Sequence, residues 1–148
     1  NTEYPLLNDF LYEAIYVPTG IEPPPKTVIY SPELQVYVAD FGRKEHDIAL
    51  VAEVNQKIIG AVWVRIMNDY GHIDNTTPSL AMSVFKEYQG LGVGTALLEE
   101  LIATLKSKGY SQVSLSVQKD NYAVKMYQKV GFTILKEVDE EYIMVIAL

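Results

Sequence analysis

The sequence contains no cysteine, and only two of its 148 residues are histidine. Without cysteine the chain can form no disulfide, no thiolate-bound metal site and no enzyme intermediate carried on a cysteine sulfur. The two histidines, His46 and His72, are too few and too far apart in the sequence to suggest a metal site. We therefore expect a protein that binds no metal.

Long hydrophobic runs are also missing. No apolar run approaches the ~20 residues that a membrane-spanning helix needs. Residues 1–10 lack the basic stretch followed by an apolar stretch that is typical of a secretory signal. We expect a protein that does not enter a membrane and that resides in the cytoplasm.

Positive charge is scarce, because 12 Lys and Arg residues stand against 19 Asp and Glu residues and give a formal net charge of -7. An acidic protein repels the phosphate backbone of nucleic acids, so we expect no nucleic-acid partner. The same charge would attract a cationic substrate such as an amine. Acidic charge also serves solubility alone in many proteins, so both explanations stay open.

The composition is that of one globular domain over residues 1–148, with 49% apolar and 21% charged residues. Hydrophobic periodicity, cap residues and turns predict the order helix, helix, three strands, helix, strand, helix and two strands. This order indicates a mixed α/β or α+β domain built on one central sheet. In the second strand we expect Trp63 in the core and Arg65 at an edge. The expected helices are 6–15, a segment between Ser31 and Gly42, a long segment ending at Gly109, and 122–130; the expected strands are 48–54, 58–67, 80–84, 113–117, 132–138 and 142–148.

Three glycines alternate with larger residues in Gln89-Gly90-Leu91-Gly92-Val93-Gly94-Thr95, between a predicted strand and the long helix. Glycine lets a backbone approach a ligand closely and adopt torsions that other residues resist. The first N–H groups of a helix have no internal acceptor and lie at its positive end, so they can bind a diphosphate. The glycines could also serve only to let strand and helix pack tightly.

Two other phosphate-binding motifs lack their specific residues here. A dinucleotide site needs G-x-G-x-x-G and an acidic residue about 20 positions further on, where residues 111–115 carry no carboxylate. A nucleotide P-loop needs Gly-Lys followed by Ser or Thr, whereas Gly94 is followed by Thr95 and Ala96.

This segment resembles the pyrophosphate-binding motif of the GNAT superfamily of N-acetyltransferases, Gln/Arg-x-x-Gly-x-Gly/Ala, which Gln89, Gly92 and Gly94 match. The second signature of that family has an Asn, an Ala, a Tyr and a closing Gly-Phe, and residues 120–132 resemble it. The resemblance covers residues 48–132 strongly and the preceding residues weakly.

The chain departs from the family pattern at three places. Asn121 stands six residues before Tyr127 where a spacing of seven is commoner, so Asp120 is an alternative to Asn121. The strand 80–84 carries no carboxylate, although many family members keep a glutamate base near it. The first strand of the family is not visible, and residues before Asn1 could supply it.

The resemblance implies a GNAT-like single domain with a central mixed, mostly antiparallel twisted sheet and helices on both faces. It also implies an acetyl-CoA-dependent N-acyltransferase that moves an acetyl group from acetyl-CoA to a primary amine by direct attack in a ternary complex. The acceptor would be a small-molecule or peptide amine. The absence of cysteine agrees with direct transfer, because the best thioester-exchanging nucleophile is missing.

The resemblance further implies a role for each matching residue. The strand before the glycines supplies a backbone N–H to the thioester oxygen, and Tyr127 protonates the leaving thiolate. A phenol with a reference pKa near 10 stays protonated at neutral pH and can donate that proton. Tyr127 could instead only pack in the core. The expected cofactor-binding residues are Met82, Ser83, Val84, Gln89, Gly90, Leu91, Gly92, Val93, Gly94, Thr95 and Asn121.

The sequence does not assign the general base or the acceptor pocket. Glu53, Asp74 and Glu87 are candidate bases by residue type alone, and a water chain is an equal alternative. Candidates for the pocket are Tyr12, Tyr16, the loop Pro23-Pro24-Pro25 and His72, each of which could equally be core or plain surface.

Two other functions stay open. A catalytically inactive acyl-CoA-binding module of the same fold is the alternative to an enzyme, because the strand 80–84 lacks a carboxylate. A nicotinamide-binding protein is a third hypothesis, which predicts tighter binding of NADH than of CoA. The apolar last strand, 142–148, could pair with a second subunit, so we consider a homodimer.

Overall fold

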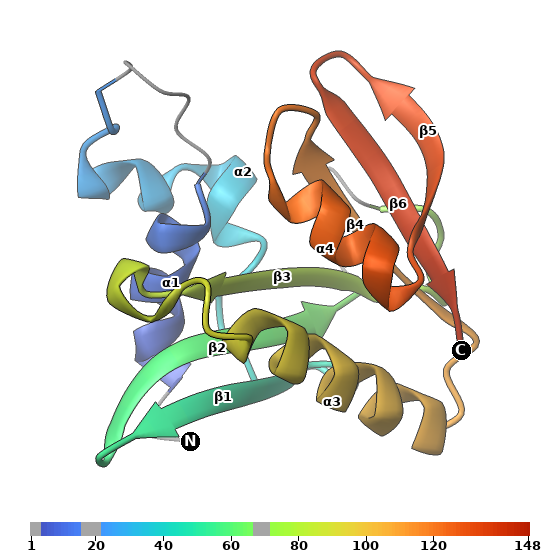
Figure 1. The fold of residues 1–148 in the computed structure, drawn as a ribbon, viewed down its shortest axis with the longest axis horizontal. Helices are drawn as coiled ribbons and strands as arrows, with labels where there is room; N and C mark the ends of the chain where they lie inside the picture. Colours follow the sequence, from blue (N-terminus) through green and yellow to red (C-terminus); the bar gives the residue numbers. More distant parts are fainter. Residues whose placement is uncertain (1–3, 16–21, 67–71) are drawn as a thin grey trace.

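The computed structural model describes residues 4–15, 22–66 and 72–148, and its elements follow the predicted order (Figure 1). The α-helices are α1 (Leu7–Ala14), α2 (Pro32–Gln35), α3 (Val93–Ser107) and α4 (Ala123–Val130). The strands are β1 (Ile48–Val54), β2 (Lys57–Arg65), β3 (Ser79–Val84), β4 (Gln112–Gln118), β5 (Thr133–Val138) and β6 (Glu141–Ala147). Short 3-10 helices are η1 (Tyr4–Leu6), η2 (Lys26–Tyr30) and η3 (Lys86–Tyr88).

The strands form one six-stranded sheet in the order β1-β2-β3-β4-β6-β5. Every neighbouring pair is antiparallel except β3 and β4, so the predicted mixed, mostly antiparallel sheet is confirmed. The parallel pair is in register only at Ser79 and Ser114, where the N–H of Ser114 donates to the carbonyl of Pro78 at 3.1 Å. Beyond that point β3 and β4 diverge, which leaves an unpaired edge on each strand.

Helices cover both faces of the sheet, as expected (Figure 1). Side chains alternate between the two faces of a strand, so neighbours in β2 enter different cores. Val62 and Val64 pack with α3 and α4, whereas Ala61 and Trp63 pack with α1, η2 and the segment after α2. Leu98, Leu101 and Leu105 of α3 are fully buried and supply the centre of the larger core.

Trp63 lies in the core as predicted, and its indole N–H donates to the carbonyl of Tyr37 at 3.0 Å. The prediction that Arg65 lies at an edge is wrong, because β2 is an interior strand between β1 and β3. The Arg65 guanidinium makes two bonds to the Asp47 carboxylate, at 2.9 and 2.8 Å, and two more to carbonyls of the segment after α2. The Arg65 guanidinium and the Asp47 carboxylate are thus both buried and form an ion pair.

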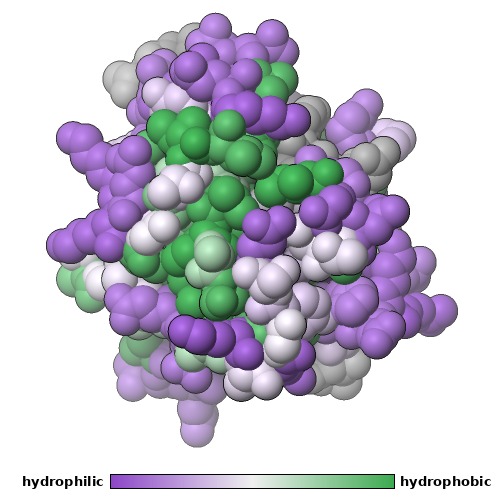
Figure 2. Space-filling model, turned by 90° about the vertical axis from the view of Figure 1, so that its right-hand side faces the viewer, coloured by the Kyte–Doolittle hydropathy of each residue, from purple (hydrophilic) through white to green (hydrophobic). Residues whose placement is uncertain are grey.

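The last strand, β6, lies between β4 and β5, so it offers no free edge to a second subunit. The edge strand at this end is β5, which has a bulge between Ile134 and Lys136 and charged residues at its centre. Bulges and charges protect an edge from pairing with another chain. Exposed Leu135 and half-buried Ile146 contribute to this end of the molecule, where Figure 2 shows hydrophobic side chains at the surface.

Candidate functional site

Helix α3 begins directly after two glycines in the left-handed region. Gly90 has φ +79° and Gly92, the N-cap residue, has φ +85°. Apart from the glycine itself and its two chain neighbours, no residue has an atom within 4 Å of the position that a Cβ would take on either glycine. The glycines are therefore required by backbone conformation and not by internal crowding, and the space in front of them is open.

The first turn of α3 has donors without acceptors. The first bond within the helix runs from the N–H of Ala96 to the carbonyl of Gly92 at 3.0 Å, and no side chain caps the helix. The N–H groups of Val93, Gly94 and Thr95 therefore have no partner in the helix and lie at its positive end. This segment, Gln89–Thr95, fits a diphosphate, and we call it the cradle.

Strand β3 turns one backbone edge toward β2 and the other toward the diverging β4. The N–H of Phe85, the residue after β3, donates to the carbonyl of Ile59 in β2 at 2.9 Å. Hydrogen bonding alternates along an antiparallel pair, so the N–H of Ser83 also faces β2. By the same alternation, the N–H groups of Met82 and Val84 face the unpaired side.

Ser83 has a different place from the one expected for it. Its hydroxyl is buried and donates to the carbonyl of Phe10 at 2.6 Å, which holds α1 against β3. With its N–H directed to β2 and its side chain directed to α1, Ser83 presents no donor on the unpaired edge. Sequence spacing could not separate Ser83 from Met82 and Val84, because only the register with β2 decides which edge each N–H takes.

Gln89, the first residue of the cradle, is tied to the unpaired edge of β3. Its side-chain amide donates to the carbonyl of Val84 at 2.9 Å. Its amide oxygen accepts a hydrogen bond from the hydroxyl of Tyr122 at 3.1 Å, at the start of α4. One side chain thus connects the end of β3, the cradle and α4, and nothing in the sequence indicated the part of Tyr122.

Asn121 stabilises the start of α4. Its side-chain oxygen accepts a hydrogen bond from the N–H of Ala123 at 2.9 Å, and its carbonyl accepts one from Val124 at 3.1 Å. These bonds satisfy donors that the first turn of a helix leaves free. Asn121 therefore positions α4 beside the cradle, whatever else its side-chain NH₂ group binds.

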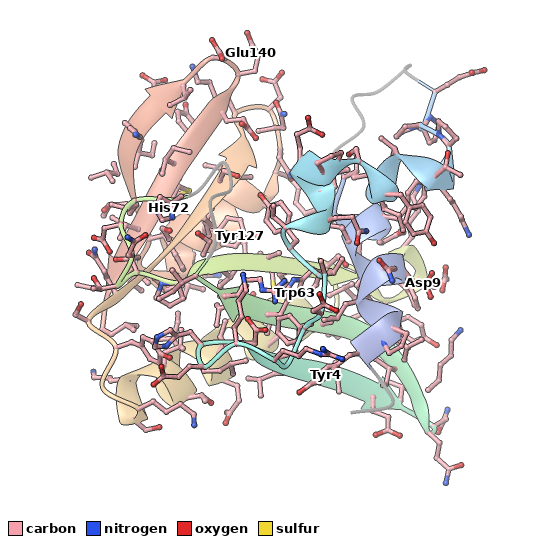
Figure 3. The ribbon with its side chains drawn as sticks, turned by 180° about the vertical axis from the view of Figure 1, so that it is seen from behind. Tyr4, Asp9, Trp63, His72, Tyr127 and Glu140 are labelled. Atoms are coloured by element: carbon pink, nitrogen blue, oxygen red, sulfur yellow. The ribbon has the colours of Figure 1, made fainter. Side chains whose placement is uncertain are left out.

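Tyr127 is 8% exposed and packs edge-on against Phe132, with the ring centroids 5.7 Å apart. Desolvation by burial, with a smaller contribution from Tyr122, raises the pKa of Tyr127 to about 12. The phenol therefore stays protonated throughout the neutral pH range. Figure 3 labels Tyr127 in the middle of the molecule, and Figure 1 shows its helix, α4, in front of β4 and above β3.

Two methionine side chains also lie at the cradle, those of the expected site residue Met82 and of Met126, to which the sequence assigned no role. A Cβ placed on Gly94 would lie 3.4 Å from the sulfur of Met126 and 3.5 Å from the terminal methyl of Met82. Both contacts are at ordinary van der Waals distance, so Gly94 is not required by space inside the protein. Met126 comes from α4 and Met82 from β3, so the two helices and β3 meet here.

None of the three candidate bases lies in β3, β4 or α4, the elements that border the divergence. Glu53 is in β1 and Glu87 in η3. Asp74 precedes the other end of β3, and hydrogen bonds from the N–H and hydroxyl of Thr76, each 2.8 Å long, hold the pKa of its carboxyl below the usual value. A lowered pKa makes a carboxylate a weaker base.

The expected acceptor residues are placed in part. The hydroxyl of Tyr12 donates to the carbonyl of Pro24 at 2.6 Å, which ties α1 to the proline loop. His72 is half-buried in the segment before β3, and Tyr16 lies outside the described residues. Within the described ranges there is no group of three or more potential metal ligands, and no helix has the length and apolarity to cross a membrane.

Comparison with known proteins identifies the family. The family model described as acetyltransferase (GNAT) family matches residues 15–132 of this chain. The chain belongs to the GNAT acetyltransferase family. The predicted family resemblance and fold class are thereby confirmed.

Two curated relatives share 35% of aligned residues with this GNAT protein. One is an acetyltransferase of Pectobacterium atrosepticum, aligned over 58% of this chain and 57% of its own length. The other is the [ribosomal protein bS18]-alanine N-acetyltransferase of Haemophilus influenzae, aligned over 57% of this chain and 52% of its own length. The matched part thus spans about half the length of each relative.

Solved structures share the fold of this GNAT protein. The PaiA N-acetyltransferase of Thermoplasma acidophilum, in complex with coenzyme A, has a TM-score of 0.72 at 21% identity and covers 99% of this chain and 94% of its own. The ribosomal-protein-S18-alanine N-acetyltransferase of Escherichia coli has a TM-score of 0.67 at 20% identity, with coverages of 99% and 88%. A putative streptothricin acetyltransferase of Bacillus anthracis, in complex with acetyl coenzyme A, has a TM-score of 0.60 at 24% identity. It covers 72% of this chain and 65% of its own.

Proposed function

We propose that this protein transfers an acetyl group from acetyl-CoA to a primary amine, by direct attack of the amine within a ternary complex. The observation that carries the proposal is the meeting of three features. An uncapped helix start with two left-handed glycines lies beside the unpaired edge of β3, and a buried, protonated phenol lies on the neighbouring helix α4. Two of the similar solved structures hold coenzyme A or acetyl-CoA, which supports the same ligand here.

The cradle would hold the diphosphate of the donor. The N–H groups of Val93, Gly94 and Thr95 would donate to its oxygens, and the open space at Gly90 and Gly92 would let the phosphates approach the backbone. Leu91, which is 72% exposed, and the side chains of Gln89 and Asn121 would border the same ligand. When bound, acetyl-CoA supplies an activated acetyl thioester.

Met82 and Val84 would stabilise the reaction through their backbone N–H groups. These groups face the unpaired edge and could donate to the carbonyl oxygen as it gains negative charge. One such donor can lower the activation free energy by ~3 kcal/mol. Ser83 has no part in this proposal, because its N–H faces β2.

Tyr127 would act as the acid. As the amine nitrogen forms its bond to the acetyl carbon and the carbon–sulfur bond breaks, the phenol would give its proton to the departing sulfur. The pKa raised to about 12 keeps that proton in place before reaction. The amine must itself lose a proton, and because the bordering elements β3, β4 and α4 carry no carboxylate near the divergence, water is the carrier that we propose.

The acceptor class that we propose is a small-molecule or peptide amine. The net charge of -7 favours a cation. The relative from Haemophilus influenzae carries a name that makes an alanine of a ribosomal protein its acceptor, so a peptide α-amine is the first acceptor to test.

Calorimetry with CoA, followed by thiol release from acetyl-CoA with a panel of amines, tests the function. We expect saturable binding of CoA and amine-dependent release of thiol. Absence of binding by folded protein would refute the proposal. Binding without turnover for any amine would favour an inactive acyl-CoA-binding module, which the lack of a carboxylate on β3 also allows.

A further inference from the structure

Two side-chain hydrogen bonds in series connect β3 to α4. The hydroxyl of Tyr122 donates to the amide oxygen of Gln89 at 3.1 Å, and the amide nitrogen of Gln89 donates to the carbonyl of Val84 at 2.9 Å. Val84 is the last residue of β3, and Tyr122 is the N-cap residue of α4. The three residues come from separate elements, and we call this connection the strap.

The strap lies at the end where the two halves of the sheet are not otherwise paired. Strands β3 and β4 are in register only at Ser79 and Ser114, at the opposite end of β3 from Val84. The divergence is therefore closed by backbone pairing at one end and spanned by the strap at the other. The strap joins the cradle to α4, the two elements that a ligand reaching from the cradle to Tyr127 would contact.

Apolar side chains also connect the cradle with α4 and β3. Met126 lies one helical turn after Tyr122, so both side chains are on one face of α4. Met126 and Met82 both lie against Gly94 of the cradle. Methionine side chains are flexible and can repack around a ligand. The hydrogen bonds of the strap, by contrast, require a fixed geometry.

We propose that Tyr122 and Gln89 form a strap across the entrance to the donor site, which opens to admit or release CoA and closes again over the bound molecule. This inference rests on the proposed function. The strap uses only side-chain atoms and the carbonyl of Val84. It leaves the N–H groups of Val93, Gly94 and Thr95 to the phosphates, so the closed strap and a filled cradle are compatible.

The strap controls rates rather than affinity. Tyr122 is 72% exposed, so its phenol swings out without loss of packing, and an exposed hydrogen bond of this kind is weak. Because the bond is present before and after binding but broken during passage, its loss speeds association and dissociation alike. We expect both rate constants for CoA to rise about fivefold in Tyr122→Phe, with the dissociation constant unchanged within about twofold.

The experiment is stopped-flow measurement of CoA association and dissociation on the full chain, with a fluorescent CoA analogue as the competing probe. The matched control is Tyr30→Phe, which removes a phenol of similar exposure (67%) in η2, on the other face of the sheet. In a Gln89→Ala background, adding Tyr122→Phe should not speed CoA exchange any further, because both changes break one connection.

The outcomes separate the strap from the function on which it rests. Wild-type protein that shows no saturable CoA binding overturns both. Normal wild-type binding with unchanged rates in Tyr122→Phe overturns the strap and leaves the proposed function standing. A change in only one of the two rate constants, with a matching change in affinity, also overturns the strap, since the bond would then exist in only one of the two states.

Discussion

The two ends of strand β3 differ in whether the polar groups around them have hydrogen-bond partners within the protein. At the Ser79 end, β3 pairs with β2 and β4, buried Thr77 accepts a hydrogen bond from Gln112 at 2.9 Å, and the neighbouring Arg65 is fully paired. At the Val84 end, the strand leaves β4 and is followed by a cradle whose N–H groups have no helical acceptor.

The difference separates stability from function along a single strand. A buried polar group costs free energy unless it is paired, so the Ser79 end can be closed only by complete hydrogen bonding. Beyond the Val84 end, residues 89–92 of the cradle are exposed, so water can satisfy free donors there until a ligand replaces it. Substitutions at the first end should therefore act on folding, and substitutions at the second end should act on ligand binding and turnover.

The largest effect is expected at the closed end. Asp47→Ala leaves the Arg65 guanidinium buried and without its carboxylate, so we expect a loss of about 3–5 kcal/mol in the free energy of unfolding. Urea-induced unfolding measures it. The control is Glu137→Ala, which breaks the exposed 3.3 Å pair with Lys119 and should cost at most about 1 kcal/mol. Equal losses in the two variants would show that the buried ion pair beside the closed end adds no more stability than a surface pair.

The next effect is expected on turnover. Tyr127→Phe removes the proposed acid and keeps the ring in the core, so we expect kcat to fall about a hundredfold while CoA still binds. Steady-state thiol release measures kcat, and calorimetry measures binding. Tyr110→Phe is the control, since Tyr110 is a half-buried phenol that hydrogen-bonds His46 away from the cradle. A Tyr127→Phe variant with normal kcat would remove the acid from the mechanism.

A smaller effect is expected from the glycines at the two ends of α3. Gly92 and Gly109 have nearly the same φ, +85° and +89°, and open space around the missing Cβ. Alanine at either position should cost about 1–2 kcal/mol of stability through left-handed strain. Only Gly92→Ala distorts the cradle, so only this variant should weaken CoA binding, by roughly tenfold. Equal CoA affinities for the two variants would argue against the cradle as the phosphate site.

The smallest effect is expected from proton loss at Tyr127, which should change the free energy of unfolding only at high pH. Its folded pKa of about 12 lies above the reference value near 10, so the folded state holds this proton more tightly. The corresponding stability is complete below pH 10 and is lost as pH rises through 12. Relative to Tyr127→Phe, the wild type should thus lose stability to urea only above pH 10. An unchanged difference in stability between the two proteins at every pH up to 12 would show that the phenol is not desolvated.

Most of the fold could be predicted from local patterns. The run of β-branched residues predicted β1 as Ile48–Val54, the range observed, and the turn after it has Asn55 and Gln56 at positive φ, as a tight hairpin requires. The sequence also predicted where α3 starts, because alternate glycines before an amphipathic run indicate both the end of a strand and a helix start. These signals lie within a few residues of the structure that they specify.

The errors concern neighbours in space. Arg65 does not lie at the expected edge, because β2 is interior and Asp47, 18 positions away, neutralises the charge. The last strand, β6, was expected to offer an edge, but β5 reaches back past it to become the outer strand. Both outcomes depend on strand order, which hydrophobic alternation does not encode.

The chain's own order of residues determined the elements, the glycine-led start of α3 and the family, because each rests on short-range torsional and hydrophobic preferences. Only the tertiary structure decided that Met82 and Val84, and not Ser83, present free N–H groups, and that Tyr122 reaches Gln89 across 33 positions. Those facts follow from strand register and from the way α4 packs on the sheet. Such contacts form only when distant segments fold against one another.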